Sequence, residues 1–284
     1  MRTRALGALG RLPPFSPILN RLMASLAGED VSFNVLGDLI EKDTVLAGNI
    51  LRVVNSAAYA RRGTINSVRR ALALLGLEKV RNTVLAMSIS RMLNAAKTPA
   101  GFSMERFDKH SVAVAMLSDL LAQHAKADYP EGAFVAGLLH DLGRLLIAMG
   151  LPNEFQTVLR TYENGDRTWI ECEQQVLGFT HATLSADALA EWKLPLEIQE
   201  AVLYHHDAAQ FSCVREATGA LPLASVLNAA NQYVNYLGHS VLTVQKSDAS
   251  GSAWIEALGM GPETTALVIS EFHAEHGAIA DFYH

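Results

Sequence analysis

Cysteine is scarce in this sequence. Among the 284 residues only Cys172 and Cys213 are cysteines, and they form no Cys-x-x-Cys pair. The sequence therefore predicts neither a disulfide framework nor a cysteine zinc ribbon. A reducing compartment fits this cysteine usage best, and we expect a cytoplasmic protein.

Charged residues are also few, and basic residues are fewer than acidic ones. Charged residues make up 18% of the chain, which has a formal net charge of −6 and a pI near 5.9. This balance argues against broad attraction to nucleic acid or to an anionic membrane, and neither is expected as a partner. Because half of the residues are apolar, the chain is expected to fold, as one large domain or as two lobes that share a core.

A hydrophobic run suited to a membrane is missing as well. The most apolar run, residues 133–151, contains His140, Asp141 and Arg144, and these exclude a plain membrane span. Near the N-terminus Arg2 and Arg4 are not followed by an apolar segment of signal-peptide length. We therefore expect a soluble protein.

Helical periodicity is abundant. Almost every segment has apolar residues at helical spacing, and no convincing run of alternating β-branched residues is present. We predict an all-α fold, in which an N-terminal helical lobe (residues 12–97) packs on a multi-helix lobe (98–240), with a C-terminal helical extension (241–284). The lobe boundary is placed at the Thr-Pro-Ala-Gly break of residues 98–101.

Capping residues indicate where several helices begin and end. Asp43 and Ser67 are expected N-caps, and Thr168 with Glu171 is expected to form a capping box. Gly76 is expected to end the Ser67 helix in the left-handed conformation. The two helices that flank Gly76 could form a DNA-binding helix-turn-helix, but a pair of core helices fits the acidic balance better.

Five histidines fall where side chains are expected to be buried. His110 lies on an apolar helical stripe, His140 lies inside one long apolar helix over 131–149, and His181, His205 and His206 lie on or beside apolar helix faces. An unpaired buried polar group costs about 1–3 kcal/mol, which a domain of ordinary stability cannot lose several times over. These histidines must be paired with each other, with the backbone, or through a shared metal.

Imidazole and carboxylate groups together suit zinc, iron and manganese. The neighbours His140 and Asp141 project about 100° apart on a helix, so they reach one metal or two adjacent metals only if that helix crosses close to the site. From periodicity alone, a shared metal site and a set of satisfied core histidines are equally good interpretations.

The order of these residues resembles that of the HD superfamily of metal-dependent phosphohydrolases. The motif is Gly137-Leu-Leu-His-Asp-Leu-Gly-Arg144, with later histidines at His181 and at His205-His206. The first lobe resembles the HDOD family in particular. Its matching segments are Leu12-Pro-Pro, Leu51-Arg-Val-Val-Asn-Ser-Ala-Ala-Tyr59 and Ile65-Asn-Ser, while Thr44 stands where that family usually has proline. The resemblance covers about residues 12–237.

The resemblance implies a site for a divalent metal (Fe, Zn, Mn or Mg). The candidate ligands that it places in this chain are His110, His140, Asp141, His181, His205 and His206. Three departures weaken the expected site. Asn231 replaces the terminal carboxylate, Arg106 stands where binuclear relatives have a glutamate ligand, and no Gly-Tyr-Pro signature follows His206.

The function implied by the resemblance is regulatory. We expect a bacterial signal-transduction module that acts through protein partners, with a partly retained metal site and without turnover. A nucleotide or phosphate is a further candidate ligand for the pocket of this module. The alternative is an active, mononuclear phosphohydrolase acting on a nucleotide or phosphomonoester. In that case Asp141 and Arg144 are the catalytic candidates, and Arg144 contacts phosphate oxygens. If Arg144 is instead a solvated last-turn residue, it has no such role.

Overall fold

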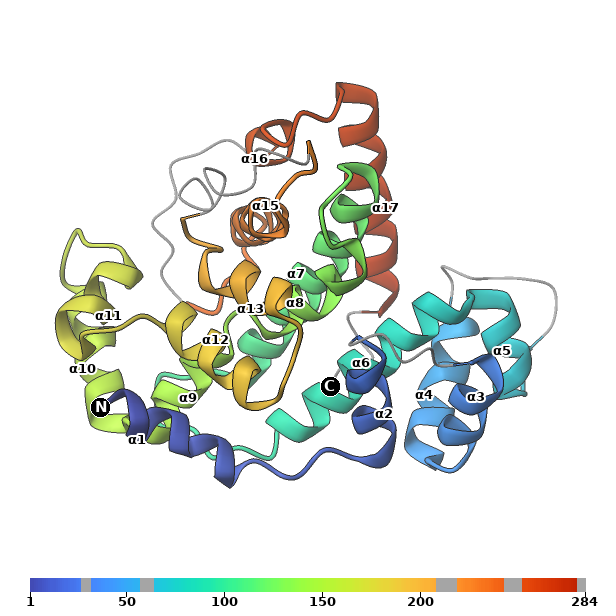
Figure 1. Cartoon of the computed structure of the whole chain (residues 1–284), viewed down its shortest axis with the longest axis horizontal. Coiled ribbons are helices and arrows are strands. Elements are labelled where there is room, and N and C mark those ends of the chain that lie inside the picture. Colours follow the sequence, from blue (N-terminus) through green and yellow to red (C-terminus); the bar gives the residue numbers. More distant parts are fainter. Residues whose placement is uncertain (27–31, 57–63, 208–218, 243–251, 280–284) are drawn as a thin grey trace. The chain divides into compact units, whose positions relative to one another are not determined.

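The computed structural model describes residues 1–26, 32–56, 64–207, 219–242 and 252–279 (Figure 1). Cys213 and the end of the 51–59 motif lie outside these ranges. The described residues form helices and no strand, and a single isolated bridge joins Ala127 and Leu221. The predicted all-α fold is confirmed.

The chain forms two compact units. Unit 1 consists of Met1–Leu12 and Ala96–Ile269, and unit 2 consists of Pro13–Ala95 and Ser270–His284. The first residues of the chain thus belong to unit 1, which also contains the five histidines that are candidate metal ligands.

Unit 2 has a core of large apolar side chains that are fully buried, among them Leu36, Ile40 and Leu72. Its helices are α2 (Pro17–Ser25), α3 (Phe33–Glu41), α4 (Thr44–Val54), α5 (Val68–Leu75), α6 (Leu77–Leu93) and the end of α17 (Pro262–Ile279). Side chains along most of α6 are buried, whereas a DNA-recognition helix needs an exposed face.

The expected caps of unit 2 form, with one difference. The Asp43 carboxylate accepts from the backbone N–H of Leu46 at 3.1 Å, and Ser67 Oγ accepts from Arg70 N at 3.4 Å. Gly76 has a positive φ of 85°, but its ψ of 157° lies outside the left-handed helical basin. The expectation of a left-handed Gly76 was therefore wrong, because α6 begins at the next residue and the chain must extend between the two helices.

Unit 1 carries most of the helices. They are α1 (Arg2–Leu6), η1 (Gly7–Arg11), α7 (Met104–His124), η3 (Pro130–Gly132), α8 (Ala133–Leu139), α9 (Leu142–Gly150), α10 (Pro152–Glu163), α11 (Trp169–Leu177), α12 (His181–Glu191), α13 (Leu196–Leu203), α15 (Leu223–Tyr236), α16 (Ala253–Glu256) and the start of α17. Helix α8 packs against α7, α13 and α15, and α9 packs against α12 (Figure 1).

The close contact between α7 and α8 depends on a glycine. A Cβ atom at Gly137 would lie 2.5 Å from Ala115 Cα, a separation that real Cβ atoms do not reach. Only a residue without a side chain lets the two backbones approach this closely. This contact brings His110 on α7 near the end of α8.

The long helix expected over 131–149 is instead divided. A 3-10 turn, α8 and α9 follow one another, with His140 and Asp141 at the junction of the two α-helices. Asp141 has φ −97° and ψ 8°, and the His140 ring bonds back to the carbonyl of Gly137 at 2.8 Å. The break was missed because both halves are apolar, and periodicity cannot detect a short interruption.

Two further findings concern the hydrophobic helices. Helix α13 ends at Leu203, so His205 and His206 lie in the turn after it rather than on the predicted helix from Pro195 to His206. Within the described residues one stretch, Pro130–Gly150, is long and apolar enough to span a membrane, and the apolar window of 18 residues within it is buried inside the protein.

Candidate metal centre

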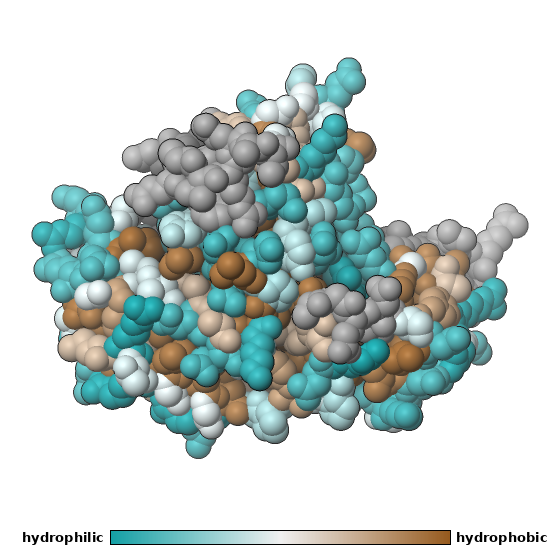
Figure 2. Space-filling model, in the orientation of Figure 1, coloured by the Kyte–Doolittle hydropathy of each residue, from teal (hydrophilic) through white to brown (hydrophobic). Residues whose placement is uncertain are grey.

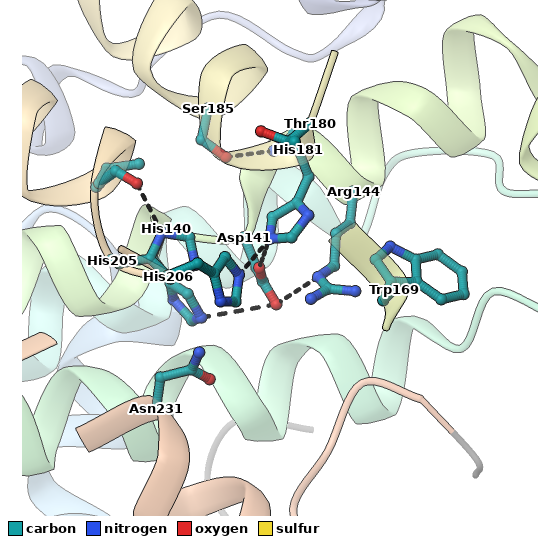
Figure 3. A network of polar contacts seen from close by, with 12 residues as sticks. His140, Asp141, Arg144, Trp169, Thr180, His181, Ser185, His205, His206 and Asn231 are labelled. Carbon is teal, nitrogen blue, oxygen red and sulfur yellow. Dashed lines mark hydrogen bonds and ion pairs between the residues drawn. The ribbon is translucent and has the colours of Figure 1, made fainter. Parts of the chain in front are cut away.

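Four parts of unit 1 bring the candidate ligands together. His110 comes from α7, His140 and Asp141 from the α8–α9 junction, His181 from the first residue of α12, and His205 and His206 from the turn after α13. All are buried except His206, which is half-buried. Figure 3 shows His140, His205 and His206 to the left of the Asp141 carboxylate, His181 above it and Arg144 to its right.

The Asp141 carboxylate divides the histidines into two groups. Its Oδ2 atom lies 3.6 Å from Nε2 of both His110 and His140, and its Oδ1 atom lies 3.0 Å from Nε2 of His181. Donor atoms of His110, His140 and Asp141 lie within 4.8 Å of one another, as do those of Asp141, His181, His205 and His206. Asp141 is therefore the common member of two ligand groups.

Three of the imidazoles have their protonation fixed by backbone carbonyls. The Nδ1–H groups donate to carbonyl oxygens, from His110 to His239 at 2.7 Å, from His140 to Gly137 at 2.8 Å and from His205 to Val202 at 2.6 Å. A neutral imidazole carries one proton, so each of these rings has an unprotonated Nε2. An Nε2 lone pair is what a metal ion binds.

The Nε2 atoms of His110 and His140 lie 3.2 Å apart, and neither ring in its neutral form has a proton to share there. Burial, and then the charge of His140, lowers the pKa of His110 to about 3, so a proton does not fill the gap at neutral pH. Two metal–nitrogen bonds of 2.0–2.1 Å at a tetrahedral angle place their nitrogens about 3.3 Å apart. The buried Nε2 of His205 also has no hydrogen-bond partner among the described residues. The unprotonated Nε2 atoms of His110, His140 and His205 are therefore suited to bind a metal ion.

His181 is held by a carboxylate that the sequence analysis missed. Oε2 of Glu173 accepts from His181 Nδ1 at 2.7 Å and from the backbone N–H of His181 at 2.8 Å, and Glu173 is 1% exposed. Trp169 Nε1 donates to the other oxygen of Glu173 at 2.6 Å. A carboxylate behind a histidine fixes its ring and its tautomer, as is common behind metal ligands.

A sequence signal for Glu173 was present. Residues Trp169, Cys172, Glu173 and Leu177 form the buried stripe of α11, at spacings of three, one and four. A glutamate in such a stripe needs a partner, in the same way as the histidines. The capping box of this helix is confirmed at Thr168 and Glu171.

The protonation states of most candidate ligands suit metal binding. His181 is the exception: burial and the charge of Arg144 act to lower its pKa, but the carboxylates of Glu173 and Asp141 outweigh them and raise it. Burial is the main cause that lowers the pKa of His140, and it lowers those of His205 and His206 strongly. Burial alone would raise the pKa of Asp141, but Arg144, His140 and His181 hold it well below its usual range. Most of the candidate ligands are thus neutral imidazoles around an ionised carboxylate, the form that metals require.

A second close backbone contact positions His181. A Cβ atom at Gly143 would lie 2.1 Å from the carbonyl oxygen of His181, so α9 and the start of α12 can meet only at a glycine. Ser185 Oγ accepts from the backbone N–H of Gly143 at 2.7 Å. These contacts place His181 beside the Asp141 carboxylate.

Arg144 is buried rather than solvated. It is 8% exposed, its Nε lies 2.8 Å from Asp141 Oδ2, and its guanidinium carbon lies 5.4 Å from the ring centre of Trp169. The Nη1 atom is buried without a hydrogen-bond partner among the described residues. Arg144 therefore keeps donor capacity that Asp141 does not use.

Two of the three predicted departures lie within the described residues, whereas the segment after Asp207, where a Gly-Tyr-Pro signature is missing, lies outside them. Asn231 on α15 is 2% exposed and points its amide toward the histidines (Figure 3), and its Oδ1 accepts from Asn235 Nδ2 at 3.0 Å. Arg106, one turn before His110, donates from Nη1 to the carbonyl oxygen of Leu242 at 2.8 Å.

Comparison with known families agrees with this geometry. A sequence model of the HDOD domain matches residues 12–208, more than half of the chain. The chain belongs to the HDOD domain family. The match includes all the candidate histidines, whereas Asn231 lies beyond it.

Solved structures share the HDOD fold over nearly the whole chain. An HDOD domain protein of unknown function from Geobacter sulfurreducens is 24% identical, with coverage of 100% of this chain and 98% of that chain and a TM-score of 0.78. A predicted phosphohydrolase from Shewanella amazonensis SB2B is 21% identical, with coverage of 99% and 98% and a TM-score of 0.74. At these identities the likeness establishes the fold.

Longer proteins also contain a similar region. A predicted signal-transduction protein from Marinobacter aquaeolei VT8 is 22% identical, with coverage of 98% of this chain and 61% of that chain and a TM-score of 0.72. An uncharacterized protein from Treponema pallidum (strain Nichols) is 20% identical over 229 residues, or 80% of this chain. This chain spans 42% of the length of that curated relative.

Proposed function

We propose that this HDOD protein is a signal-transduction module that holds a divalent metal ion and acts through a protein partner, without hydrolysing a phosphoester. The main support for the metal site is that the unprotonated Nε2 atoms of His110 and His140 face each other at 3.2 Å. The likeness to a predicted signal-transduction protein from Marinobacter aquaeolei supports the regulatory role.

The donor set favours some metals over others. The ligands are rich in imidazole, with Asp141 as the carboxylate among them, which suits zinc, iron or manganese better than magnesium. A divalent ion bound here would lower the pKa of a coordinated water to about 7. His110, His140 and Asp141 would hold one side of the site, and His181, His205 and His206 the other.

Two features favour binding over turnover. Asn231 is neutral at the position where the resemblance places a carboxylate, so the site has less negative charge to offset a metal. Arg144 pairs with Asp141 at 2.8 Å and so competes with a metal for Oδ2. Neither feature helps turnover, because Asn231 has no carboxylate to bind the metal or to accept a proton from a bound water, and Arg144 occupies an oxygen of Asp141.

The partner surface is not obvious from hydropathy. On the face drawn in Figure 2, hydrophobic side chains of the described residues occur in several separate groups among hydrophilic ones. A broad continuous apolar patch is the usual mark of a permanent interface. The pattern on this face fits a transient partner, as signalling contacts often are.

The test is elemental analysis of the purified, untagged protein by plasma mass spectrometry, combined with a phosphoesterase screen. We expect close to stoichiometric zinc, iron or manganese in wild type, loss of metal in His140→Ala, and no hydrolysis of nitrophenyl phosphates or nucleotides. The matched control is His124→Ala, because His124 lies exposed at the end of α7 and outside both ligand groups. If the protein contained no metal after incubation with excess divalent ions, the proposed metal site would be wrong.

The second candidate function is a metal-dependent phosphohydrolase. The observation in its favour is the spare donor capacity of Arg144 next to Asp141, since guanidinium pairs well with phosphate oxygens. Metal-dependent turnover in wild type, lost in both Asp141→Asn and Arg144→Met while the melting temperature stays within a few degrees, would establish this function instead.

A further inference from the structure

A small pocket in unit 1 adjoins the metal centre through Arg144. Its lining residues come from the turn before α7, from α9, α10 and α11, and from the segment after α15: Gly101, Phe102, Ser103, Arg144, Phe155, Leu159, Trp169, Val241 and Leu242. None of these residues is a candidate metal ligand. The pocket is therefore a neighbour of the metal centre and separate from it.

The polar part of the pocket is electropositive. Arg144 supplies a full charge and has a buried Nη1 without a hydrogen-bond partner among the described residues. Ser103 is the N-cap of α7, a helix of 21 residues, so the positive end of that helix dipole lies at the pocket. Glu105, in the first turn of α7, is ion-paired with Lys109 at 2.6 Å and does not line the pocket.

The rest of the wall is apolar and tightly packed. Phe102 lies 5.8 Å from Phe155, ring centre to ring centre, and Phe155 lies 6.2 Å from Trp169. A Cβ atom at Gly101 would lie 2.7 Å from Leu159, so the glycine lets the Leu159 side chain pack closely against the backbone here. Such a wall excludes water and so strengthens the attraction of an anion to Arg144.

We propose that this pocket binds a small oxyanion, a phosphate or carboxylate group, held between the Arg144 guanidinium and the N-terminus of α7. The small size of the pocket suits such a headgroup. The inference rests on the proposed metal site: once Asp141 binds a metal ion, the charge of Arg144 needs another counter-ion. The bound anion is a ligand that the module senses.

Trp169 connects the pocket to the metal centre. Its ring lines the pocket beneath Arg144, and its Nε1 donates to Glu173, which holds His181. An anion that binds the Arg144 guanidinium also changes the environment of the Trp169 ring. Occupancy of the pocket should therefore change the fluorescence of Trp169.

The experiment is a titration of the full-length, metal-loaded protein with inorganic phosphate, followed by tryptophan fluorescence and by calorimetry. Chloride at matched ionic strength serves as the reference. The informative variant is Ser103→Asp, because aspartate caps a helix as well as serine does but places a carboxylate in the pocket. Ser67→Asp makes the same change at the N-cap of α5, and Ser67 does not line the pocket.

We expect saturable phosphate binding in wild type and in Ser67→Asp. The apparent Kd should rise at least about ten-fold in both variants, because Ser103→Asp places a negative charge next to the anion and Arg144→Met removes a charge-assisted contact. Trp169→Phe should bind phosphate but lose the fluorescence response.

Two results would overturn the inference. The first is that wild type shows no saturable phosphate binding above the chloride reference. The second is that Ser103→Asp binds phosphate as tightly as wild type and that phosphate binding is lost when the metal is removed, which would mean that phosphate binds to the metal ion. Metal content measured on the same samples shows separately whether the proposed metal site has failed.

Discussion

His110 and His140 turn their Nε2 atoms toward each other at 3.2 Å, while each donates its Nδ1–H to a backbone carbonyl. The relationship is unfavourable in a metal-free, neutral protein, because two lone pairs face each other in a buried space. It becomes favourable when a cation lies between them. The arrangement therefore links the stability of unit 1 to metal and to pH.

The first prediction is acid sensitivity of the metal-free protein. Since the folded-state pKa of His110 is about 3, below the usual 6.5, the unfolded chain binds more protons between these values. The stability is present above pH 6.5 and is lost as the pH falls toward 3, by up to about 1.4 kcal/mol per pH unit for one such histidine.

The measurement is the free energy of unfolding by urea at several pH values between 7 and 5. His110→Leu should show a shallower pH dependence than wild type, because one proton uptake has been removed. His140, His205 and His206 have lowered pKa values too and should retain part of the slope. An identical slope in His110→Leu would contradict the buried, neutral state of His110.

The second prediction concerns Glu173. Glu173→Gln removes the charge behind His181, and we expect metal affinity to fall about 10- to 100-fold. The measurement is competition with a chelator of known affinity. Glu171→Gln is the matched control, because glutamine preserves a capping box and Glu171 is not bonded to His181. Equal affinities in the two variants would show that Glu173 does not support the metal ligand.

The third prediction tests the link through Trp169. Trp169→Phe keeps an aromatic ring near Arg144 but loses the N–H that donates to Glu173 at 2.6 Å. We expect metal affinity to fall less than in Glu173→Gln, and the double variant should be no weaker than Glu173→Gln alone. Full additivity of the two effects would mean that Trp169 acts independently of Glu173.

The fourth prediction concerns Gly143. Gly143→Ala would place a Cβ atom 2.1 Å from the carbonyl oxygen of His181, so α9 and α12 must separate. We expect a loss of stability of several kcal/mol and a loss of metal binding, measured by thermal unfolding and elemental analysis.

Gly48→Ala is the control for that substitution. Gly48 lies exposed inside α4 and has no described atom near the added Cβ. Alanine there should stabilise the protein by about 0.5–1 kcal/mol. A Gly143→Ala protein as stable as Gly48→Ala would show that the α9–α12 contact is not as close as described.

Much of the fold was determined by the sequence itself. Apolar residues at helical spacing identify the all-α class, and the caps at Asp43, Ser67 and Thr168 act within one turn, so local sequence is enough to place them. The HDOD motifs identify the family for the same reason, because they are short and contiguous. The buried positions of His110, His140 and His181 also follow from their apolar neighbours.

Other features were decided only by the tertiary structure. The break between α8 and α9 lies between two close backbone contacts, at Gly137 and Gly143, which involve residues far away in the sequence. The approach of His110 to His140 and the support of His181 by Glu173 depend on how helices cross. Side-chain spacing along one helix contains no information about such crossings. The sequence thus determined that these histidines are buried, and the packing of helices decided which side chains meet.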